Sequence, residues 1–200
     1  MKIILATKNK KKITEIQEKF KSFNIEHVSI KDIEGLPDII EDGATFKDNA
    51  SKKALVIAQH TGEVSLADDS GLVVDELHGR PGVFSARYAG ENASDEDNYK
   101  KLLTELGATP EKKRTARFVC VIAIATPGGE LHTAEGTCEG TITFKPQGTL
   151  GFGYDPVFFL PEYNKTMAEI SMEEKNKISH RGEALEKAVP LLESILKKYL

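Results

Sequence analysis

Apolar residues along this chain follow two periods, one typical of strands and one typical of helices. Short apolar runs predict strands at residues 2–6, 28–30, 116–125, 131–144 and 156–160. Apolar positions repeated every three or four residues predict helices through 13–20, 46–61, 94–106 and 184–196. Pro190 predicts a kink or a break in the last of these helices. Because helices and strands alternate and tight turns join some strands, the sequence predicts an α/β fold with a mixed sheet.

The segment 65–75 places two adjacent carboxylates, Asp68 and Asp69, between apolar runs. An unpaired buried carboxylate is very costly, so both are expected at a strand end or in a loop, with Gly71 providing a turn. Successive strand residues point to opposite faces, so one carboxylate would face a cleft and the other would brace the loop. This pattern is consistent with a divalent-metal site in which one carboxylate activates water. A solvated Asp-Ser-Gly turn explains the stretch equally well.

A lysine-rich turn follows the first predicted strand and precedes the first helix. Lys8, Lys10, Lys11 and Lys12 lie among the polar residues that enter this helix. A helix N-terminus offers unpaired N–H groups and the positive end of a dipole, which suits phosphate. The polar residues Thr7 and Asn9 are able to cap the helix or bind a phosphate oxygen. The alternative is a solvated lysine run on a surface helix.

Two further polar positions lie near the second predicted helix. Glu41 precedes Asp42 and Gly43, which fits either a turn or an additional oxygen ligand for a hard cation. Lys53 falls beside the apolar stripe of the helix, where it is able to reach into a cleft or to keep its ammonium in water. Both positions therefore remain candidates for a charged site.

The last third of the chain contains two segments suited to a flat ligand. Phe152 lies between glycines, so it is able to project from a bent backbone onto an aromatic ring system. Asp155 is able to accept hydrogen bonds from ring N–H groups or to brace the loop. A β-bulge with a core aromatic is the alternative. Lys175, His180 and Arg181 offer donors for phosphate or base carbonyl oxygens, unless they only form a polar helix entry.

Composition restricts the classes of protein that fit. The 200 residues suffice for one domain of one or two lobes, and 29% charged with 40% hydrophobic residues indicates a soluble globular protein. The net charge of −4 disfavours a nucleic-acid scaffold, and no apolar run is long enough for a membrane span. Cys120 and Cys138 have neither metal-ligand spacing nor disulfide density, which predicts a cytoplasmic protein.

These segments together predict a site for a nucleoside polyphosphate, with separate groups for phosphate, metal and base. The GxxxxGK[ST] loop of P-loop enzymes is absent from the sequence, which disfavours that class.

Five motifs in order resemble the inosine triphosphate pyrophosphatase family, the XTP/dITP diphosphatases, over residues 2–192. They are Thr-x-Asn-x-x-Lys at 7–12, Ala-Asp-Asp-Ser-Gly-Leu at 67–72, Pro-Gly-x-x-Ser-Ala-Arg-Tyr at 81–88, Gly-Phe-Gly-Tyr-Asp-Pro at 151–156 and Glu-Lys-Asn-x-Ile-Ser-His-Arg-Gly at 174–182. The first turn is bulkier and more basic here, because many relatives carry Gly at the positions of Lys8 and Lys11.

The resemblance implies that residues 1–200 form a single two-lobed pyrophosphatase domain. Its long central mixed sheet would be flanked by helices, with the active-site cleft between the lobes. The resemblance further implies a homodimer, a Mg²⁺ requirement, and hydrolysis of ITP, dITP and XTP to the monophosphate and pyrophosphate. The expected partner is thus a small nucleotide, with no nucleic acid and no membrane.

Roles for individual residues follow from the same resemblance. Asp69 is the expected general base and, with Glu41, a metal ligand. The expected triphosphate-binding residues are Thr7, Lys8, Asn9, Lys10, Lys11, Lys12, Lys53 and Ser70. The expected nucleoside-binding residues are Phe152, Gly153, Tyr154, Asp155, Lys175, His180 and Arg181. Two other functions are consistent with these motifs, a Maf-like pyrophosphatase for modified pyrimidine or methylated nucleotides, and a regulatory protein that binds a nucleotide without hydrolysing it.

Overall fold

The computed structural model describes residues 2–21, 23 and 25–199, which group into two compact units. The first unit comprises the chain up to Asp69, the segment Cys120–Gly136, and the residues from Glu183 onward. The second unit comprises Ser70–Val119 and Thr137–Gly182. Three strands and the last helix each contribute residues to both units, so the chain crosses between them within regular elements.

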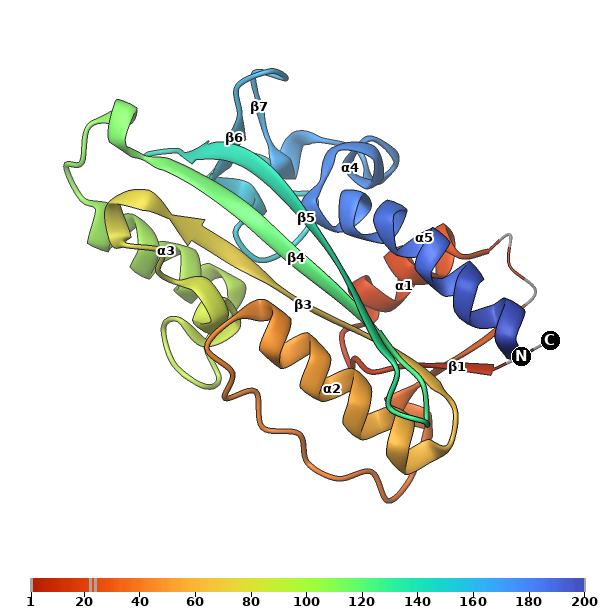
Figure 1. Ribbon diagram of the computed structural model, residues 1–200. Helices are drawn as coiled ribbons and strands as arrows, with labels where there is room; N and C mark the ends of the chain where they lie inside the picture. Colours follow the sequence, from red (N-terminus) through yellow and green to blue (C-terminus); the bar gives the residue numbers. More distant parts are fainter. Residues whose placement is uncertain (1, 22, 24, 200) are drawn as a thin grey trace. The chain divides into compact units, whose positions relative to one another are not determined.

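The strands form one hydrogen-bonded mixed sheet in the order β2-β1-β3-β4-β5-β6-β7 (Figure 1). Their bounds are β1 Lys2–Leu5, β2 Glu26–Ser29, β3 Val64–Val74, β4 Thr115–Ala125, β5 Leu131–Ile142, β6 Phe158–Leu160 and β7 Lys165–Thr166. β1 pairs in parallel with β2 and β3, whereas β6 pairs antiparallel with β5 and β7. The predicted α/β class and mixed sheet are therefore confirmed.

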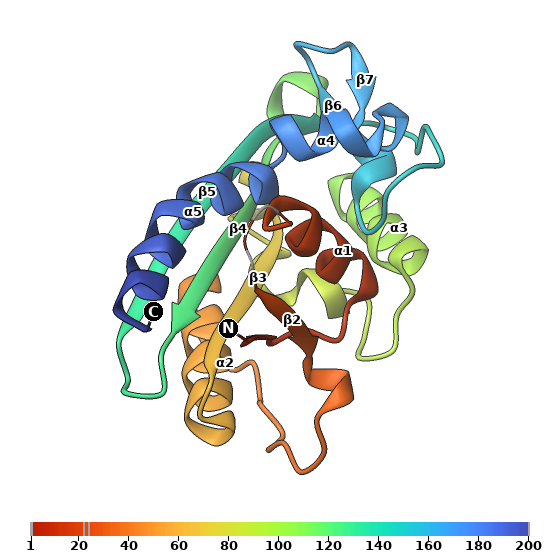
Figure 2. The ribbon, with the colours of Figure 1, turned by 90° about the vertical axis from the view of Figure 1, so that its right-hand side faces the viewer.

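Helices cover both faces of the sheet in the first unit. On one face, α1 (Lys10–Lys19) and α5 (His180–Tyr199) pack against alternate residues of β1, β3 and β4, including Leu5 and Leu66 (Figure 2). On the other face, α2 (Phe46–Thr61) packs through Ala50, Ala54 and Ile57 against the intervening residues of the same strands. The period of two in each strand thus assigns its side chains to opposite helical layers.

The second unit has a separate apolar core. Leu72, Leu102, Phe118 and Phe158 belong to this core, together with other residues of β3 to β6 and the helix α3 (Asp95–Leu106). A short helix, α4 (Met172–Ile178), follows β7 and leads directly into α5. Sequence patterns did not indicate β7 or α4, because a two-residue strand and a seven-residue helix show too little periodicity to be recognised.

Side-chain caps begin the two helices that the sequence predicted at 46–61 and 94–106. Thr45 with Asp48, and Ser94 with Asp97, form capping boxes at α2 and α3. Gly62 ends α2 in the left-handed conformation at φ 70°, which glycine adopts without a Cβ penalty. Pro190 does not break α5, which is helical from His180 to Tyr199.

The strand-end prediction for the two adjacent carboxylates is wrong. Asp68 and Asp69 lie inside the eleven-residue strand β3 and are 1% and 7% exposed, and Gly71 continues the strand instead of forming a turn. The charges are tolerated in a buried strand because cationic side chains from two helices pair with them.

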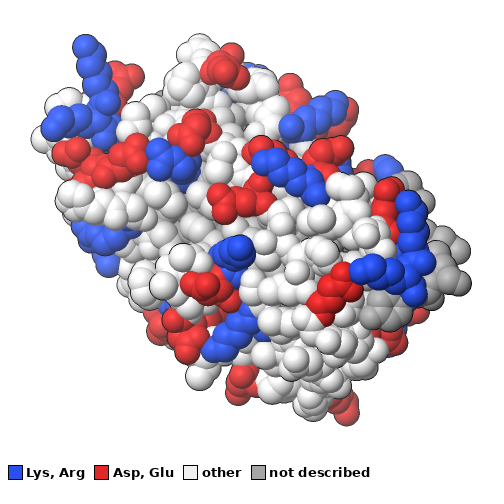
Figure 3. All heavy atoms as spheres, viewed as in Figure 1, with Lys and Arg blue, Asp and Glu red and all other residues white. Residues whose placement is uncertain are grey.

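Charged side chains of both signs are interspersed on the molecular face shown in Figure 3. Within the described residues, no helix is both long and apolar enough to span a membrane.

Candidate active site

The two carboxylates of β3 point to opposite faces of the sheet and contact different helices. Asp68 Oδ2 lies 2.9 Å from the ammonium of Lys12 on α1. Asp69 faces α2, where Asn49 Nδ2 donates to its Oδ2 over 3.1 Å and Lys53 Nζ lies 3.5 Å from its Oδ1. Strand alternation therefore divides one acidic pair between two helices, each of which supplies a lysine.

Lys53 is the centre of the charged cluster in the first unit. Its ammonium donates to Glu41 Oε1 over 2.9 Å and to the main-chain oxygen of Asp68 over 2.8 Å. The side chain is 10% exposed, so it does not extend its ammonium into bulk water. Lys53 thus links the segment around Glu41 to β3, and Glu41 and Asp69 converge on a single cation.

Burial and neighbouring charges shift the pKa of both groups. Burial raises the pKa of Asp69, and the nearby charge of Glu41 raises it further. Lys53, Lys12 and the hydrogen bond from Asn49 lower this pKa, but their combined effect is smaller. Burial by itself would lower the pKa of Lys53. The negative charges of Asp69, Asp68 and Glu41 have the larger effect, so the pKa of Lys53 is raised. Asp69 is therefore a stronger base than an exposed aspartate, beside a lysine that stays charged.

The donor set of this cluster fits a hard divalent cation. Glu41 and Asp69 present carboxylate oxygens that already converge on the ammonium of Lys53. Across residues 2–21, 23 and 25–199, no three His, Cys, Asp or Glu side chains gather into a ready-made metal cage. Mg²⁺ commonly binds through one or two carboxylates plus substrate phosphate oxygens and water, so two carboxylates suffice for such a site.

The lysine-rich turn is a capped helix entry. Asn9 Oδ1 accepts from the main-chain N–H groups of Lys11 and Lys12, at 3.0 and 3.4 Å, and Thr7 Oγ1 accepts from Asn9 N. The capping role predicted for Asn9 is confirmed. Lys8, Lys10 and Lys11 are exposed, whereas Lys12 is turned inward to Asp68.

In the second unit, Asp155 holds the aromatic-glycine loop in place. Its Oδ2 accepts from Phe152 N over 2.8 Å and lies 2.6 Å from Lys175 Nζ. A Cβ at Gly151 would collide with the same oxygen, so only glycine allows this close approach. Of the two roles predicted for Asp155, the structure favours bracing of the loop.

Phe152 lies against two cationic side chains. Lys175 Nζ is 4.6 Å and Arg181 Cζ is 5.7 Å from the centroid of its ring. Lys175 is 3% exposed, and its ion pair with Asp155 places its ammonium beside this aromatic ring. These residues come from the loop, α4 and the first turn of α5, so the predicted nucleoside residues do gather in one cluster.

His180 and Arg181 are held by contacts that the sequence did not reveal. The His180 ring stacks on Phe118 of β4 at 4.7 Å between centroids and 15° between planes. Arg181 Nη2 donates to Ser70 Oγ over 2.9 Å. Ser70, expected among the triphosphate residues, thus contacts a residue of the nucleoside group.

Tyr154 and Gly153 complete this loop through polar contacts inside the second unit. The Tyr154 hydroxyl donates to Ser85 O over 2.8 Å, and burial raises the pKa of Tyr154, so the hydroxyl stays protonated. Gly153 N donates to Asp95 Oδ2 at the start of α3. Both interactions anchor the loop that carries Phe152.

Sequence reasoning missed three residues that support the predicted groups, namely Asn49, Asp95 and Phe118. Asn49 had one available signal, because it precedes Lys53 by four positions and so lies on the same helix face. Asp95 and Phe118 had none, because each lies more than fifty residues from its partner in the chain.

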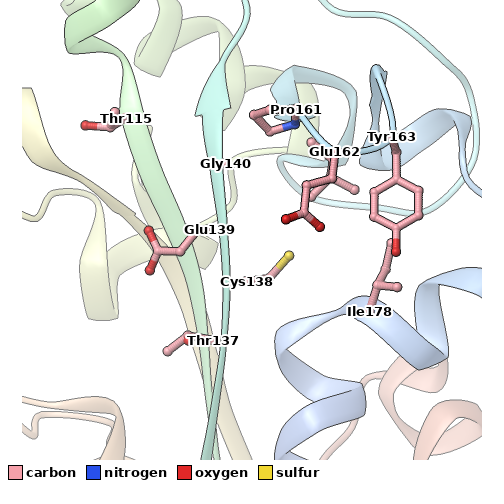
Figure 4. Close-up of a pocket in the computed structure, with 10 residues that line it drawn as sticks. Thr115, Thr137, Cys138, Glu139, Gly140, Pro161, Glu162, Tyr163 and Ile178 are labelled. Atoms are coloured by element: carbon pink, nitrogen blue, oxygen red, sulfur yellow. The ribbon is translucent and has the colours of Figure 1, made fainter.

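A pocket of about 600 Å³ lies elsewhere in the second unit (Figure 4). Residues of β5, the β6–β7 turn and α4 line it, among them Cys138, Glu162 and Ile178. The predicted site residues do not line this pocket, so it does not belong to the candidate site.

Comparisons with known proteins identify relatives that align with nearly the whole chain. The chain is 56% identical over 192 residues to a dITP/XTP pyrophosphatase of Desulforamulus reducens, covering 96% of each chain. It is 52% identical to a dITP/XTP pyrophosphatase of Geobacter sulfurreducens, covering 92% of each.

Solved structures show the same fold. A HAM1 protein from Coxiella burnetii superposes with a TM-score of 0.90 at 42% identity, over 97% of this chain and 99% of the other. The Staphylococcus aureus Ham1 protein superposes with a TM-score of 0.86 at 41% identity, over the full length of both. The profile of the Ham1 family matches residues 3–191, and the chain therefore belongs to this family.

Proposed function

We propose that this protein hydrolyses the triphosphates of non-canonical purine nucleosides, ITP, dITP and XTP, to the nucleoside monophosphate and pyrophosphate. The observation that supports it most is the buried Asp69, held between Asn49 and Lys53 beside Glu41, in a chain more than half identical to named dITP/XTP pyrophosphatases. Water would attack the α-phosphorus, the bond from the α-phosphorus to the bridging oxygen would break, and pyrophosphate would leave.

Asp69 is the proposed general base, and its raised pKa supports that role. Its carboxylate would hold the attacking water and take one proton from it. Lys53 and Lys12 would place their ammonium groups near phosphate oxygens, with Thr7, Lys8, Asn9, Lys10, Lys11 and Ser70 as further proposed triphosphate contacts. Positioning and charge stabilisation contribute most to this type of reaction.

Glu41 and Asp69 are the proposed ligands of Mg²⁺. The convergence of both carboxylates on the ammonium of Lys53 supports this assignment. When bound, Mg²⁺ supplies positive charge that neutralises phosphate oxygens.

The cluster of the second unit is the proposed binding site for the base. Phe152 would stack on the purine, and His180 and Arg181 would donate to its 6-oxo group. Adenine presents an amino donor at this position, which leaves buried donors unpaired, and such a mismatch discriminates by about 10⁴–10⁵. The burial of His180 and Arg181, at 5% and 2% exposed, supports this selection against ATP.

A homodimer in the cytoplasm is the proposed form of the enzyme, with residues 1–200 acting as one catalytic domain. The exposed side chains of Phe144 and Leu150 are consistent with an interface between two copies of the chain. Light scattering on the purified protein tests the assembly, and a mass equal to one chain would contradict it.

Pyrophosphate release tests the proposed function. Purified protein is incubated with ITP, XTP, GTP, ATP and a methylated pyrimidine triphosphate, each with and without Mg²⁺, and Asp69→Asn is assayed in parallel. We expect Mg²⁺-dependent release of pyrophosphate from ITP and XTP that is lost in the variant. Release of orthophosphate, preference for the pyrimidine, or tight binding without turnover would refute the proposal.

A further inference from the structure

Asn49 contacts two parts of the active site of the first unit at once. Its Nδ2 donates to Asp69 Oδ2 over 3.1 Å, and its Oδ1 accepts from Gly43 N over 2.8 Å. Gly43 lies two residues after Glu41, the proposed metal ligand. The side chain is 1% exposed, so bulk water does not replace either hydrogen bond.

Chemistry determines which way this amide faces. The main-chain N–H of Gly43 is only a donor, so it requires the oxygen of the Asn49 amide. The NH₂ group must then face Asp69, whose ionised carboxylate only accepts. The two contacts therefore require each other, and a flipped amide would lose both.

The Asn49 hydrogen bond also determines the rotation of the Asp69 carboxylate. Oδ2 is occupied by Asn49, whereas Oδ1 lies 3.5 Å from Lys53 Nζ, the ammonium that also contacts Glu41 Oε1. One oxygen is thus held by Asn49, and the other is presented to the charged cluster around Lys53. Asn49 and Lys53 are four residues apart on α2, so a single helix face orients both oxygens.

The contact with Gly43 is close enough to require glycine. A Cβ at Gly43 would lie 2.7 Å from Asn49 Oδ1 and 2.7 Å from Asp48 Cβ. Gly43 has no left-handed backbone conformation that would by itself explain the glycine. The close approach of the amide is the structural reason for glycine at this position.

We propose that Asn49 is a positioning residue that presents Asp69 Oδ1 to the reaction and holds the Glu41 segment in place beside Asp69. This inference rests on the proposed function, because the position of Asp69 matters only if Asp69 acts on the substrate. Both polar ends of the Asn49 amide are taken up by Asp69 and Gly43, so its effect on the reaction would pass through Asp69.

The main test is the isosteric variant Asn49→Asp. It keeps an acceptor for Gly43 N but removes the donor to Asp69. We expect kcat for ITP to fall about 100-fold, the loss typical of a misplaced catalytic group, while KM stays close to that of the wild type. A variant that is folded at the assay temperature and keeps the wild-type kcat would overturn the inference.

A matched control comes from a second buried amide. Asn98 is 3% exposed, accepts from Ala89 N and donates to Ala86 O, so it joins main-chain groups only. We expect Asn98→Asp to lower the melting temperature without the selective loss of kcat. Equal kcat losses in both variants would show that a disturbed buried amide is sufficient, and would contradict a special role for Asn49.

A swap of the two side chains separates stability from position. The double variant Asn49→Asp with Asp69→Asn again pairs one amide with one carboxylate. The amide is then on β3 and the carboxylate is on α2. We expect it to recover the melting temperature lost in Asn49→Asp and to remain inactive, because the carboxylate is now on α2. Recovery of activity would refute the inference.

Gly43→Ala provides an independent route if Asn49→Asp does not fold. The new methyl group would displace the amide from its other end, so the same fall in kcat at nearly unchanged KM is expected. Wild-type kcat in a folded Gly43→Ala protein would overturn the inference. Wild-type protein that fails to hydrolyse ITP would instead refute the proposed function, which keeps the two failures distinguishable.

Discussion

Lys12 Nζ lies 2.9 Å from Asp68 Oδ2, and this ion pair joins the lysine-rich helix entry to the interior of β3. The side chain of Asp68 is 0% exposed and that of Lys12 is 16% exposed. The aspartate therefore depends on Lys12 for compensation of its charge. Its neighbour Asp69 depends in the same way on Lys53 and Asn49 from another helix.

Removing only one partner of this ion pair is expected to destabilise the fold. Lys12→Met leaves Asp68 buried and charged, which costs about 3–5 kcal/mol of unfolding free energy. The double variant with Asp68→Asn should recover most of that loss. Urea unfolding of both variants measures the change in unfolding free energy. A Lys12→Met protein as stable as the wild type would contradict a stabilising ion pair between Lys12 and Asp68.

The stability of Asp69→Asn relative to the wild type is expected to increase as the pH rises. Because the folded pKa of Asp69 is raised above 3.8, its contribution to stability is fully present below its unfolded pKa. That contribution is lost as the pH rises through the folded pKa. The difference in melting temperature between Asp69→Asn and the wild type should thus increase with pH. Thermal unfolding in a pH series measures it, and a difference that shrinks as the pH rises would have the wrong sign.

The activity should rise toward alkaline pH. Asp69 acts as a base only when it is deprotonated. Its raised pKa moves the acidic limb of the kcat–pH profile to higher pH. Bound Mg²⁺ opposes this shift by favouring the ionised carboxylate. A kcat profile for ITP at saturating Mg²⁺ provides the measurement, and an acidic optimum would argue against Asp69 as the base.

Arg181→Ala should impair ITP turnover more than folding. The guanidinium donates to Ser70 Oγ and lies beside the Phe152 ring. Arg114→Ala is the matched control, because Arg114 is equally buried but donates to main-chain carbonyls such as Ile142 O. We expect the control to lose stability and keep its preference for ITP over ATP. An Arg181→Ala enzyme with full ITP activity would remove Arg181 from the base site.

Two glycines of the Phe152 loop separate a steric effect from backbone strain. Gly151 and Gly153 both have positive φ, at 77° and 62°, but only a Cβ at Gly151 would meet Asp155. Gly151→Ala should displace Asp155 and raise KM for ITP more than Gly153→Ala does. Steady-state kinetics on both variants make the comparison, and equal effects would mean that strain alone accounts for the glycine at 151.

The sequence by itself determined the elements whose signals are local. The apolar periods identified α2, α3, β4 and β5 close to their observed bounds, and these helices are also capped by residues next to them in the chain. The motifs also predicted one group of residues for metal and phosphate and another for the base.

Only the tertiary structure decided how the charges of the site are compensated. Asp68 and Asp69 could be placed in a buried strand only once Lys12, Asn49 and Lys53 had been brought to them from other elements. The stacking of Phe118 under His180 likewise joins residues 62 positions apart. The physical reason is that desolvation of a charge is a local cost, whereas the groups that offset it are distant in the chain, and sequence periodicity does not report such contacts.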